Sequence, residues 1–219
     1  VVSWGTGAAV PAGLGNVTAI AAGASHSLAR KSDGTVVAWG DNSYGQSTVP
    51  GGITNATAVA AGEKLSLVLR SNGTLTAWGN ATFNQTTIPA AATGITAIAC
   101  GNDHSLALKS DGTVVAWGRN DTLQCNIPAG LTGVVAIGAG AYHSLAVRGD
   151  GSVVAWGWNL GGQATVPPGL SGVVRVAGGY GFSLAQKADG TVVAWGDSSD
   201  GATAIPAEAT RVTAIAAGA

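Results

Sequence analysis

The chain has little charge, few aromatic residues, two cysteines and no methionine. Only 10% of its 219 residues are charged and the net charge is −1, so it offers no basic surface to a phosphate backbone or an anionic membrane. We therefore expect no nucleic acid partner. No apolar run approaches the roughly 20 residues that cross a bilayer, and we expect no membrane insertion.

The sequence also lacks the usual signatures of chemistry. Cys100 and Cys125 have no metal-ligand spacing and make no disulfide framework, although a bond between them is left open. Paired carboxylates, a phosphate-binding glycine loop and a calcium loop are all missing. The sequence therefore predicts no enzyme, no catalytic residues, no metal site and no cofactor. The start at Val1 suggests a processed chain or a fragment.

What the chain does have is a repeat of about 39 residues. A Trp-Gly pair recurs first after 35 residues and then four times after 39, and a proline recurs with the same period. Six cycles are present, the last of them incomplete, and they favour one domain over residues 1–219. The repeated tryptophans are Trp4, Trp39, Trp78, Trp117, Trp156 and Trp195.

Each cycle predicts three short strands. The segments VTAIAAG, HSLAxK and TVVAWG are β-branched or alternate apolar with polar residues, which is typical of strands. A turn such as Asp33-Gly34 joins the second strand to the third as a tight hairpin. Hairpins imply antiparallel sheets and so favour a propeller over a parallel solenoid. The small residues of VTAIAAG suit an innermost strand.

The expected fold is an all-β propeller of six blades. The chain begins on a third-strand segment and ends just after a sixth first-strand segment, so the two ends are expected to share the last blade and remove exposed strand edges. The second strand of that blade is missing from the sequence. A truncated or open ring derived from a seven-bladed parent is therefore the alternative.

The residues that repeat in register are interpreted as framework. The repeated tryptophans are expected to fill the space between blades. His26, His104 and His143 share one position, but Leu65 and Phe182 occupy it in the other full cycles. Because this position also accepts apolar residues, the histidines are interpreted as structural. We expect each of them to form a hydrogen bond to the neighbouring backbone.

Function is expected where the cycle varies. Two stretches vary, the pair after each first strand and the loop after each Trp-Gly, and antiparallel connections place both on one face. Every aromatic residue outside the framework falls in them, interspersed with charged residues. Aromatic loops on a rigid scaffold are typical of protein recognition, with carbohydrate binding and a structural or assembly role as alternatives. The predicted partner-binding residues are Tyr44, Phe83, Tyr142, Trp158, Tyr180, Lys64, Asp103 and Arg119.

These motifs resemble the regulator of chromosome condensation repeat along essentially the whole chain. The compact cycle VVAWGDNSYGQSTVP is more similar still to the family of secreted bacterial β-lactamase inhibitory protein II, seven-bladed propellers that grip an enzyme with loops on one face. That resemblance implies a secreted, extracellular protein whose partner is a secreted enzyme such as a β-lactamase. The exchange-factor members of the wider family act on a small GTPase and touch chromatin, but the charge and the lack of a basic arm disfavour that reading.

Overall fold

The computed structural model describes residues 1, 9–199 and 201–218. Within this part every regular element is a β-strand, so no helix is present that could span a membrane. The strands form five sheets of three antiparallel strands. Each sheet is one blade, with an inner, a middle and an outer strand in chain order, and the blades are numbered 1 to 5 along the chain from β1–β3 to β13–β15. The inner strands are β1 (Val17–Ala22), β4 (Ala56–Ala61), β7 (Ile95–Cys100), β10 (Val134–Ala139) and β13 (Val173–Gly178).

The other two strands of each blade follow the predicted second and third segments. The middle strands are β2 (His26–Lys31), β5 (Leu65–Arg70), β8 (His104–Lys109), β11 (His143–Arg148) and β14 (Phe182–Lys187). The outer strands are β3 (Val36–Gly40), β6 (Leu75–Gly79), β9 (Val114–Gly118), β12 (Val153–Gly157) and β15 (Val192–Gly196).

The predicted hairpin between middle and outer strands is confirmed. Gly34 has a φ of 77°, which only glycine adopts without strain. The Asp33 Oδ1 accepts a hydrogen bond from the Thr35 backbone N–H at 2.9 Å, and this bond fixes the turn. The same arrangement recurs in the other blades, so the turn sets the register of each outer strand.

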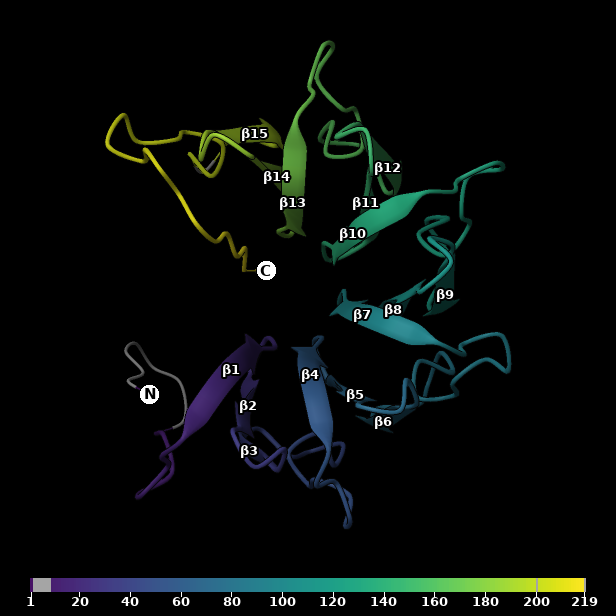
Figure 1. Ribbon diagram of the computed structural model, residues 1–219, viewed down its shortest axis with the longest axis vertical. Helices are drawn as coiled ribbons and strands as arrows, with labels where there is room; N and C mark the ends of the chain where they lie inside the picture. The colour runs from purple at the N-terminus through teal and green to yellow at the C-terminus, as the bar shows by residue number, and fades with distance from the viewer. Residues whose placement is uncertain (2–8, 200, 219) are drawn as a thin grey trace.

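The five blades surround a common axis with their inner strands closest to it (Figure 1). This arrangement confirms the innermost position of the small-residue strand. The backbone of one blade approaches the next so closely that a Cβ on Gly62 would lie 2.3 Å from the Gly101 carbonyl oxygen. A side chain at Gly62 is therefore excluded by the neighbouring blade rather than by its own strand.

Among the described residues the hydrophobic core forms four clusters, between blades 1 and 2, 2 and 3, 3 and 4, and 4 and 5. Each cluster is closed by one framework tryptophan, which is 6–8% exposed. The Trp117 Nε1 donates a hydrogen bond of 2.9 Å to the backbone carbonyl of Gln85 in the preceding blade. The expected role of the repeated tryptophans in filling the space between blades is thus confirmed for Trp78, Trp117, Trp156 and Trp195.

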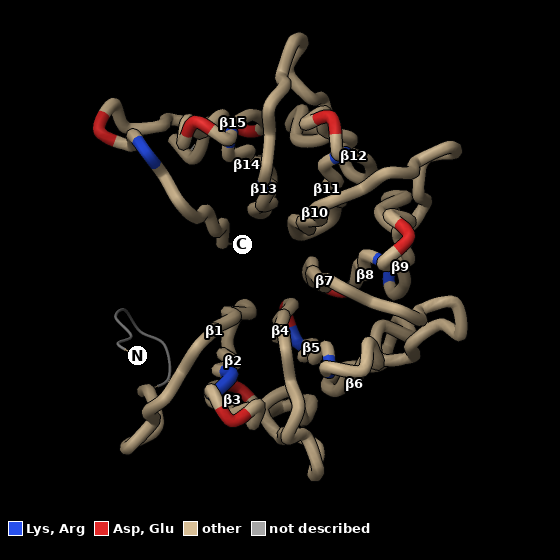
Figure 2. The backbone as a smooth tube through the Cα atoms, in the orientation of Figure 1, with Lys and Arg blue, Asp and Glu red and all other residues tan. Residues whose placement is uncertain are grey.

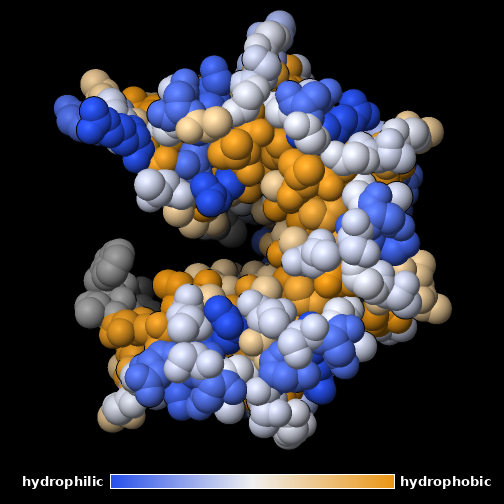
Figure 3. Space-filling model, in the orientation of Figure 1, coloured by the Kyte–Doolittle hydropathy of each residue, from blue (hydrophilic) through white to orange (hydrophobic). Residues whose placement is uncertain are grey.

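The sixth inner strand, expected at 212–218, does not form in the structure. Each inner strand pairs with the middle strand of its own cycle, and the sequence holds no sixth middle strand. The segment lies instead against blade 5, where the Gln186 Nε2 donates to the Val212 carbonyl and the Arg175 guanidinium to the Thr213 carbonyl. Figure 3 shows a gap between the described atoms of this segment and those of β1. The N-terminal part of the expected shared blade falls mostly on residues 2–8, which lie outside the described residues.

Candidate functional site

The structure brings the two variable stretches of each cycle together on one face, which we call the loop face. It comprises the pairs that follow the inner strands and the loops that follow the outer strands. The backbone N–H of Arg119, the first loop residue of blade 3, donates to the Asp103 carbonyl at 2.9 Å, and Trp158 donates to Tyr142 in the same way in blade 4. All eight predicted partner-binding residues lie on this face.

A buried glutamine holds each of the first four loops. Its Oε1 accepts a hydrogen bond from a loop backbone N–H, for example from Phe83 to Gln85 at 2.7 Å. Its own backbone carbonyl accepts a hydrogen bond from the indole N–H of the tryptophan in the next blade. The loop and the blade interface are therefore fixed by the same residue. Sequence reasoning missed this role, although the 39-residue spacing was its signal. The glutamines are Gln46, Gln85, Gln124 and Gln163, all with no exposed surface.

Each loop also requires one left-handed residue just before that glutamine position. Gly45, Gly162 and Gly201 occupy it in three blades, with φ between 73° and 83°. In blade 3 the residue is Leu123, with a φ of 64° and 59% of its surface exposed. An exposed leucine in this conformation costs about 1–2 kcal/mol, and such strain often marks a functional position.

We expect Leu123→Gly to stabilise the protein by about 0.5–1 kcal/mol, because glycine relieves the strain but adds entropy to the unfolded chain. Urea unfolding at neutral pH measures this change. The matched control is Gly162→Leu at the equivalent position of blade 4, which should destabilise by a similar amount or more. A lower midpoint for Leu123→Gly would show that the left-handed leucine is not strained, because only the entropic cost of glycine would then remain.

Three aromatic rings from blades 4 and 5 form a cluster on the loop face. Tyr142, Trp158 and Tyr180 pack edge to face, with ring centroids 5.8–6.0 Å apart in all three pairs. Such pairs contribute about 0.5–1.5 kcal/mol beyond their buried area. Tyr180 is nonetheless 50% exposed. The cluster is thus a fixed apolar surface with at least one ring open to solvent.

The other two aromatic residues carry cations above their rings. The Lys64 Nζ lies 4.7 Å from the centre of the Tyr44 ring. The Arg119 guanidinium lies 4.9 Å from the Phe83 ring and 5.3 Å from the Tyr142 ring. Arg119 of blade 3 therefore links Phe83 of blade 2 to the aromatic cluster of blades 4 and 5, and these residues form one continuous surface.

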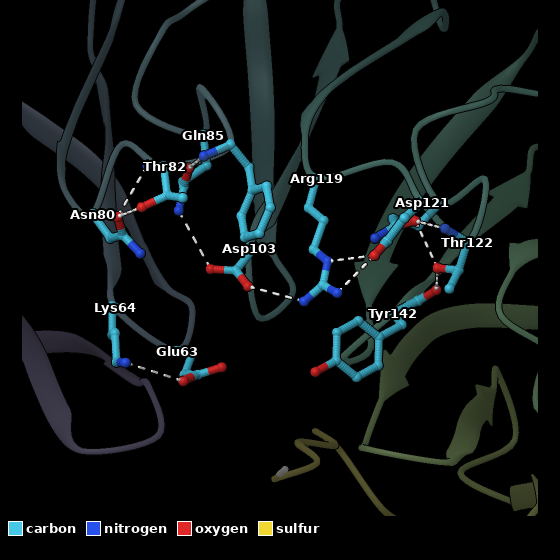
Figure 4. A network of polar contacts seen from close by, with 12 residues as sticks. Glu63, Lys64, Asn80, Thr82, Gln85, Asp103, Arg119, Asp121, Thr122 and Tyr142 are labelled. Carbon is cyan, nitrogen blue, oxygen red and sulfur yellow. Dashed lines mark hydrogen bonds and ion pairs between the residues drawn. The ribbon is translucent and has the colours of Figure 1, made fainter.

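Acidic groups hold Arg119 in place (Figure 4). Its guanidinium donates to Asp121 at 2.6 Å and lies 3.7 Å from Asp103. Burial raises the pKa of the Asp103 carboxyl, and the negative charge of Glu63 raises it further, against the opposing charges of Arg119 and Lys64. The charged residues thus interact with one another across blades 2 and 3 instead of extending freely into solvent.

Two exposed leucines belong to the same face and were missed in the sequence. Leu160 is 88% exposed and Leu123 is 59% exposed, and both occupy variable loop positions. Exposed apolar residues beside aromatic ones are enriched at interaction sites. The signal in the sequence was simply their presence in a loop where the other cycles carry polar residues or glycine.

The repeated histidines lie below the loops, between blades. The Nε2 of His143 lies 2.8 Å from the Ser183 Oγ of the next blade, and that hydroxyl donates to the Gln163 carbonyl. Because the serine proton is used in this second bond, the histidine must donate through Nε2–H. His104 and His26 bond to Ser144 and Ser66 in the same way. The histidines are structural, but their partner is a serine side chain and not the backbone that we expected.

The described residues contain no group of three or more His, Cys, Asp or Glu side chains that could hold a metal ion. The open question about the cysteines is answered by their geometry, since both are free thiols. Burial raises the pKa of each to about 12, so neither is a reactive thiolate at neutral pH.

Comparison with solved structures places this architecture among known propellers. Yeast RCC1 (Prp20), solved bound to Kap60, is 23% identical with a TM-score of 0.75 over 93% of this chain and 66% of the other. Prp20p from Saccharomyces cerevisiae, solved in a study of binding to Gsp1p and histones, is 24% identical with a TM-score of 0.73 over 88% and 60%. The ectodomain of the Physcomitrella patens receptor kinase CR4 is 21% identical with a TM-score of 0.75 over 92% and 56%. The chain thus spans about 56–66% of these proteins. No curated protein sequence matches it significantly.

The sequence itself matches a family model in four of its cycles. The model of the regulator of chromosome condensation (RCC1) repeat matches residues 17–46, 95–124, 134–163 and 173–202, which together make up more than half of the chain. Each matched segment runs from an inner strand, through the middle and outer strands, into a loop of the loop face. The chain belongs to the RCC1 repeat family.

Proposed function

We propose that this protein binds a protein partner on its loop face. The observation that carries the proposal is the edge-to-face cluster of Tyr142, Trp158 and Tyr180, joined to Phe83 through Arg119. Tyrosine, tryptophan and arginine are the residues that dominate protein interfaces. They stand on blades whose loops are fixed by buried glutamines, so little entropy is lost when a partner docks.

The ring geometry favours a protein over a sugar. A carbohydrate stacks on the exposed faces of aromatic rings. In the cluster, each edge-to-face pair places the edge of one ring against the face of another, so part of the stacking surface is already used. The related yeast proteins were solved with, or studied for binding to, other proteins, which agrees with a protein partner here.

We expect a variant with Tyr44, Phe83, Tyr142, Trp158 and Tyr180 all changed to alanine to lose its partner, with affinity falling about 100-fold or more. The partner is first captured by the unaltered protein from an extract of the source organism, and its affinity is then measured by calorimetry. Far-UV circular dichroism checks that the variant still folds. A glycan array run in parallel gives the competing outcome, reproducible sugar binding that the same variant loses.

The matched control changes exposed apolar residues away from the loop face. Val135→Thr and Val174→Thr remove apolar surface near the start of β10 and β13, where the equivalent residues Thr57 and Thr96 are already threonine. This control should bind the partner as tightly as the unaltered protein. If the five-alanine variant also binds normally, the loop face is not the docking surface.

A finer version of the proposal rests on the resemblance to β-lactamase inhibitory protein II. In that version the protein is secreted and the partner is a secreted enzyme whose active site the loop face covers. Inhibition kinetics against a panel of β-lactamases test it directly. Competitive inhibition that the five-alanine variant loses would support it, and normal enzyme rates at saturating protein would contradict it.

A further inference from the structure

A cavity of about 290 Å³ lies on the axis where the inner strands reach the loop face. Its wall is formed mainly by the alanine and glycine residues that end the inner strands, from Ala22 and Gly23 to Ala217 and Gly218. Sites for small molecules begin at about 300 Å³, so the cavity has room for one long side chain. Glu63 is the one charged residue in this wall among the described residues.

A second carboxylate, that of Asp103, lies beside this cavity. Its neighbour Asn102 forms part of the wall, and Asp103 itself is only 8% exposed. Its contacts are long, 3.3 Å from the Gln85 Nε2 and 3.7 Å from the Arg119 guanidinium. A carboxylate has about four acceptor sites, so Asp103 can accept a further donor beside these two contacts. In Figure 4 the Glu63 carboxylate, the Asp103 carboxylate and the Tyr142 hydroxyl point toward one another.

The two faces of the molecule differ in charge. The tube in Figure 2 shows that charged positions are few. On the loop face the described acidic residues are Asp41, Glu63, Asp103, Asp121 and Asp197, against Lys64 and Arg119. At the opposite, hairpin end of the blades and in the connections that lead to it, eight basic residues stand against five acidic ones: Arg30, Lys31, Arg70, Lys109, Arg148, Arg175, Lys187 and Arg211 with Asp33, Asp111, Asp150, Asp189 and Glu208. A partner of the loop face is therefore favoured when its surface is basic.

We propose that the partner presents a lysine or arginine side chain to the axial cavity, with its charged end between Glu63 and Asp103. The apolar stem of that side chain packs against the alanine and glycine wall, and the partner's surrounding surface covers the aromatic residues. This inference rests on the proposed function and adds the chemistry of the partner. A metal ion is disfavoured at this point because the described residues offer no group of three or more His, Cys, Asp or Glu side chains to hold one.

The test uses a capped arginine, N-acetyl-arginine methylamide, with the citrulline analogue as its neutral isostere. Titration of the ¹⁵N-labelled protein by NMR should give saturable shifts at the amides of Gly62, Gly101 and Gly140, which line the cavity. The citrulline analogue should give none. Carboxyl ¹³C shifts add a second readout, because a bound guanidinium should lower the pKa of Asp103 towards its ordinary value.

The double variant Glu63→Gln, Asp103→Asn should bind the capped arginine at least about tenfold more weakly. The matched control is Asp33→Asn, which removes a negative charge at the opposite end of the blade where the second cycle already has Asn72; it should bind normally. Equal binding of arginine and citrulline, equal weakening by the control, or no saturable shift at the highest soluble concentration would each overturn the inference. The partner-capture experiment with the aromatic variants is independent of this result, so failure of either claim is recognised separately.

Discussion

Trp117→Ala is expected to destabilise the protein by about 3–5 kcal/mol, the usual cost of emptying a large buried aromatic site. Trp117 is 6% exposed and lies in the cluster between blades 2 and 3 with Leu67, Leu69 and Ile95. Its Nε1–H also bonds to the buried Gln85 carbonyl at 2.9 Å. The substitution therefore opens a cavity and removes a donor from a buried backbone group, and these two costs act together.

Urea unfolding followed by circular dichroism measures this loss, with two further variants to separate its causes. Trp117→Phe keeps an aromatic ring but not the donor, so we expect it to cost less than the alanine substitution. Trp39→Ala is the matched control, since Trp39 is only half-buried in blade 1 and should cost clearly less. If Trp117→Ala and Trp39→Ala lower the free energy of unfolding equally, burial between two blades does not explain how Trp117 stabilises the protein.

The repeat explains why so much of the fold could be predicted from the sequence. Residues recurring every 39 positions meet the same environment in every blade, so five copies of each segment support one interpretation. The Asp33-Gly34 hairpin, the small inner strand and the packing role of the tryptophans could all be derived in this way. Each of these three features depends only on local backbone geometry or on residue size, and both can be read from the repeating sequence.

What could not be predicted depends on how one blade is placed against the next. The bond from His143 to Ser183 joins residues 40 positions apart in adjacent blades, and the dual role of Gln85 needs both a loop and the following tryptophan. The axial cavity likewise exists only because the inner strands converge. None of these follows from a single repeat, because the sequence pattern does not state the rotation between blades.

The segment 212–218 and the loop face show two further limits. The sequence of 212–218 matches the inner strands closely, yet it forms no ladder, since a strand needs a paired middle strand and β-propensity reflects that context. On the loop face the aromatic residues were identified by their variation, but their contacts were not. The contacts could not be predicted without the relative positions of blades 4 and 5, which bring together Tyr142, Trp158 and Tyr180.

Acid is expected to weaken the fold well before the carboxylates titrate, because of the buried histidines. Burial lowers the pKa of His104 to about 3 and of His143 to about 4, and it also lowers that of His26. Each donates through Nε2 to a serine, and within the described residues its buried Nδ1 has no hydrogen-bond partner. Protonation would therefore place a charge on a buried nitrogen that has no acceptor.

Acid lowers the stability if the unfolded chain binds more protons than the folded protein. In the unfolded chain a histidine binds its proton below about pH 6.5, whereas the folded protein binds it only near pH 3–4. Stability from these groups is thus complete above pH 6.5 and falls as the pH drops towards the folded values. His104 and His143 should each remove about 1.4 kcal/mol per pH unit in that window. The raised pKa of Asp103 has the opposite effect and favours the folded state as the pH falls. It is a single group, whereas three buried histidines act against it.

The double variant His104→Phe, His143→Phe isolates this effect, because the repeat already accepts phenylalanine at the position. Phe182 fits against Gly179 as His143 fits against Gly140, with ring atoms at 2.1–2.7 Å from a Cβ built on either glycine. The free energy of unfolding in urea, measured between pH 7 and pH 4.5, should fall steeply for the unaltered protein and much less steeply for the variant. The remaining slope belongs to His26, whose pKa shift is partly offset by the negative charge of Asp41. A variant that keeps the full slope would place the acid sensitivity in the carboxylates, and a flat profile for the unaltered protein would mean that the buried histidines take up protons in the folded state.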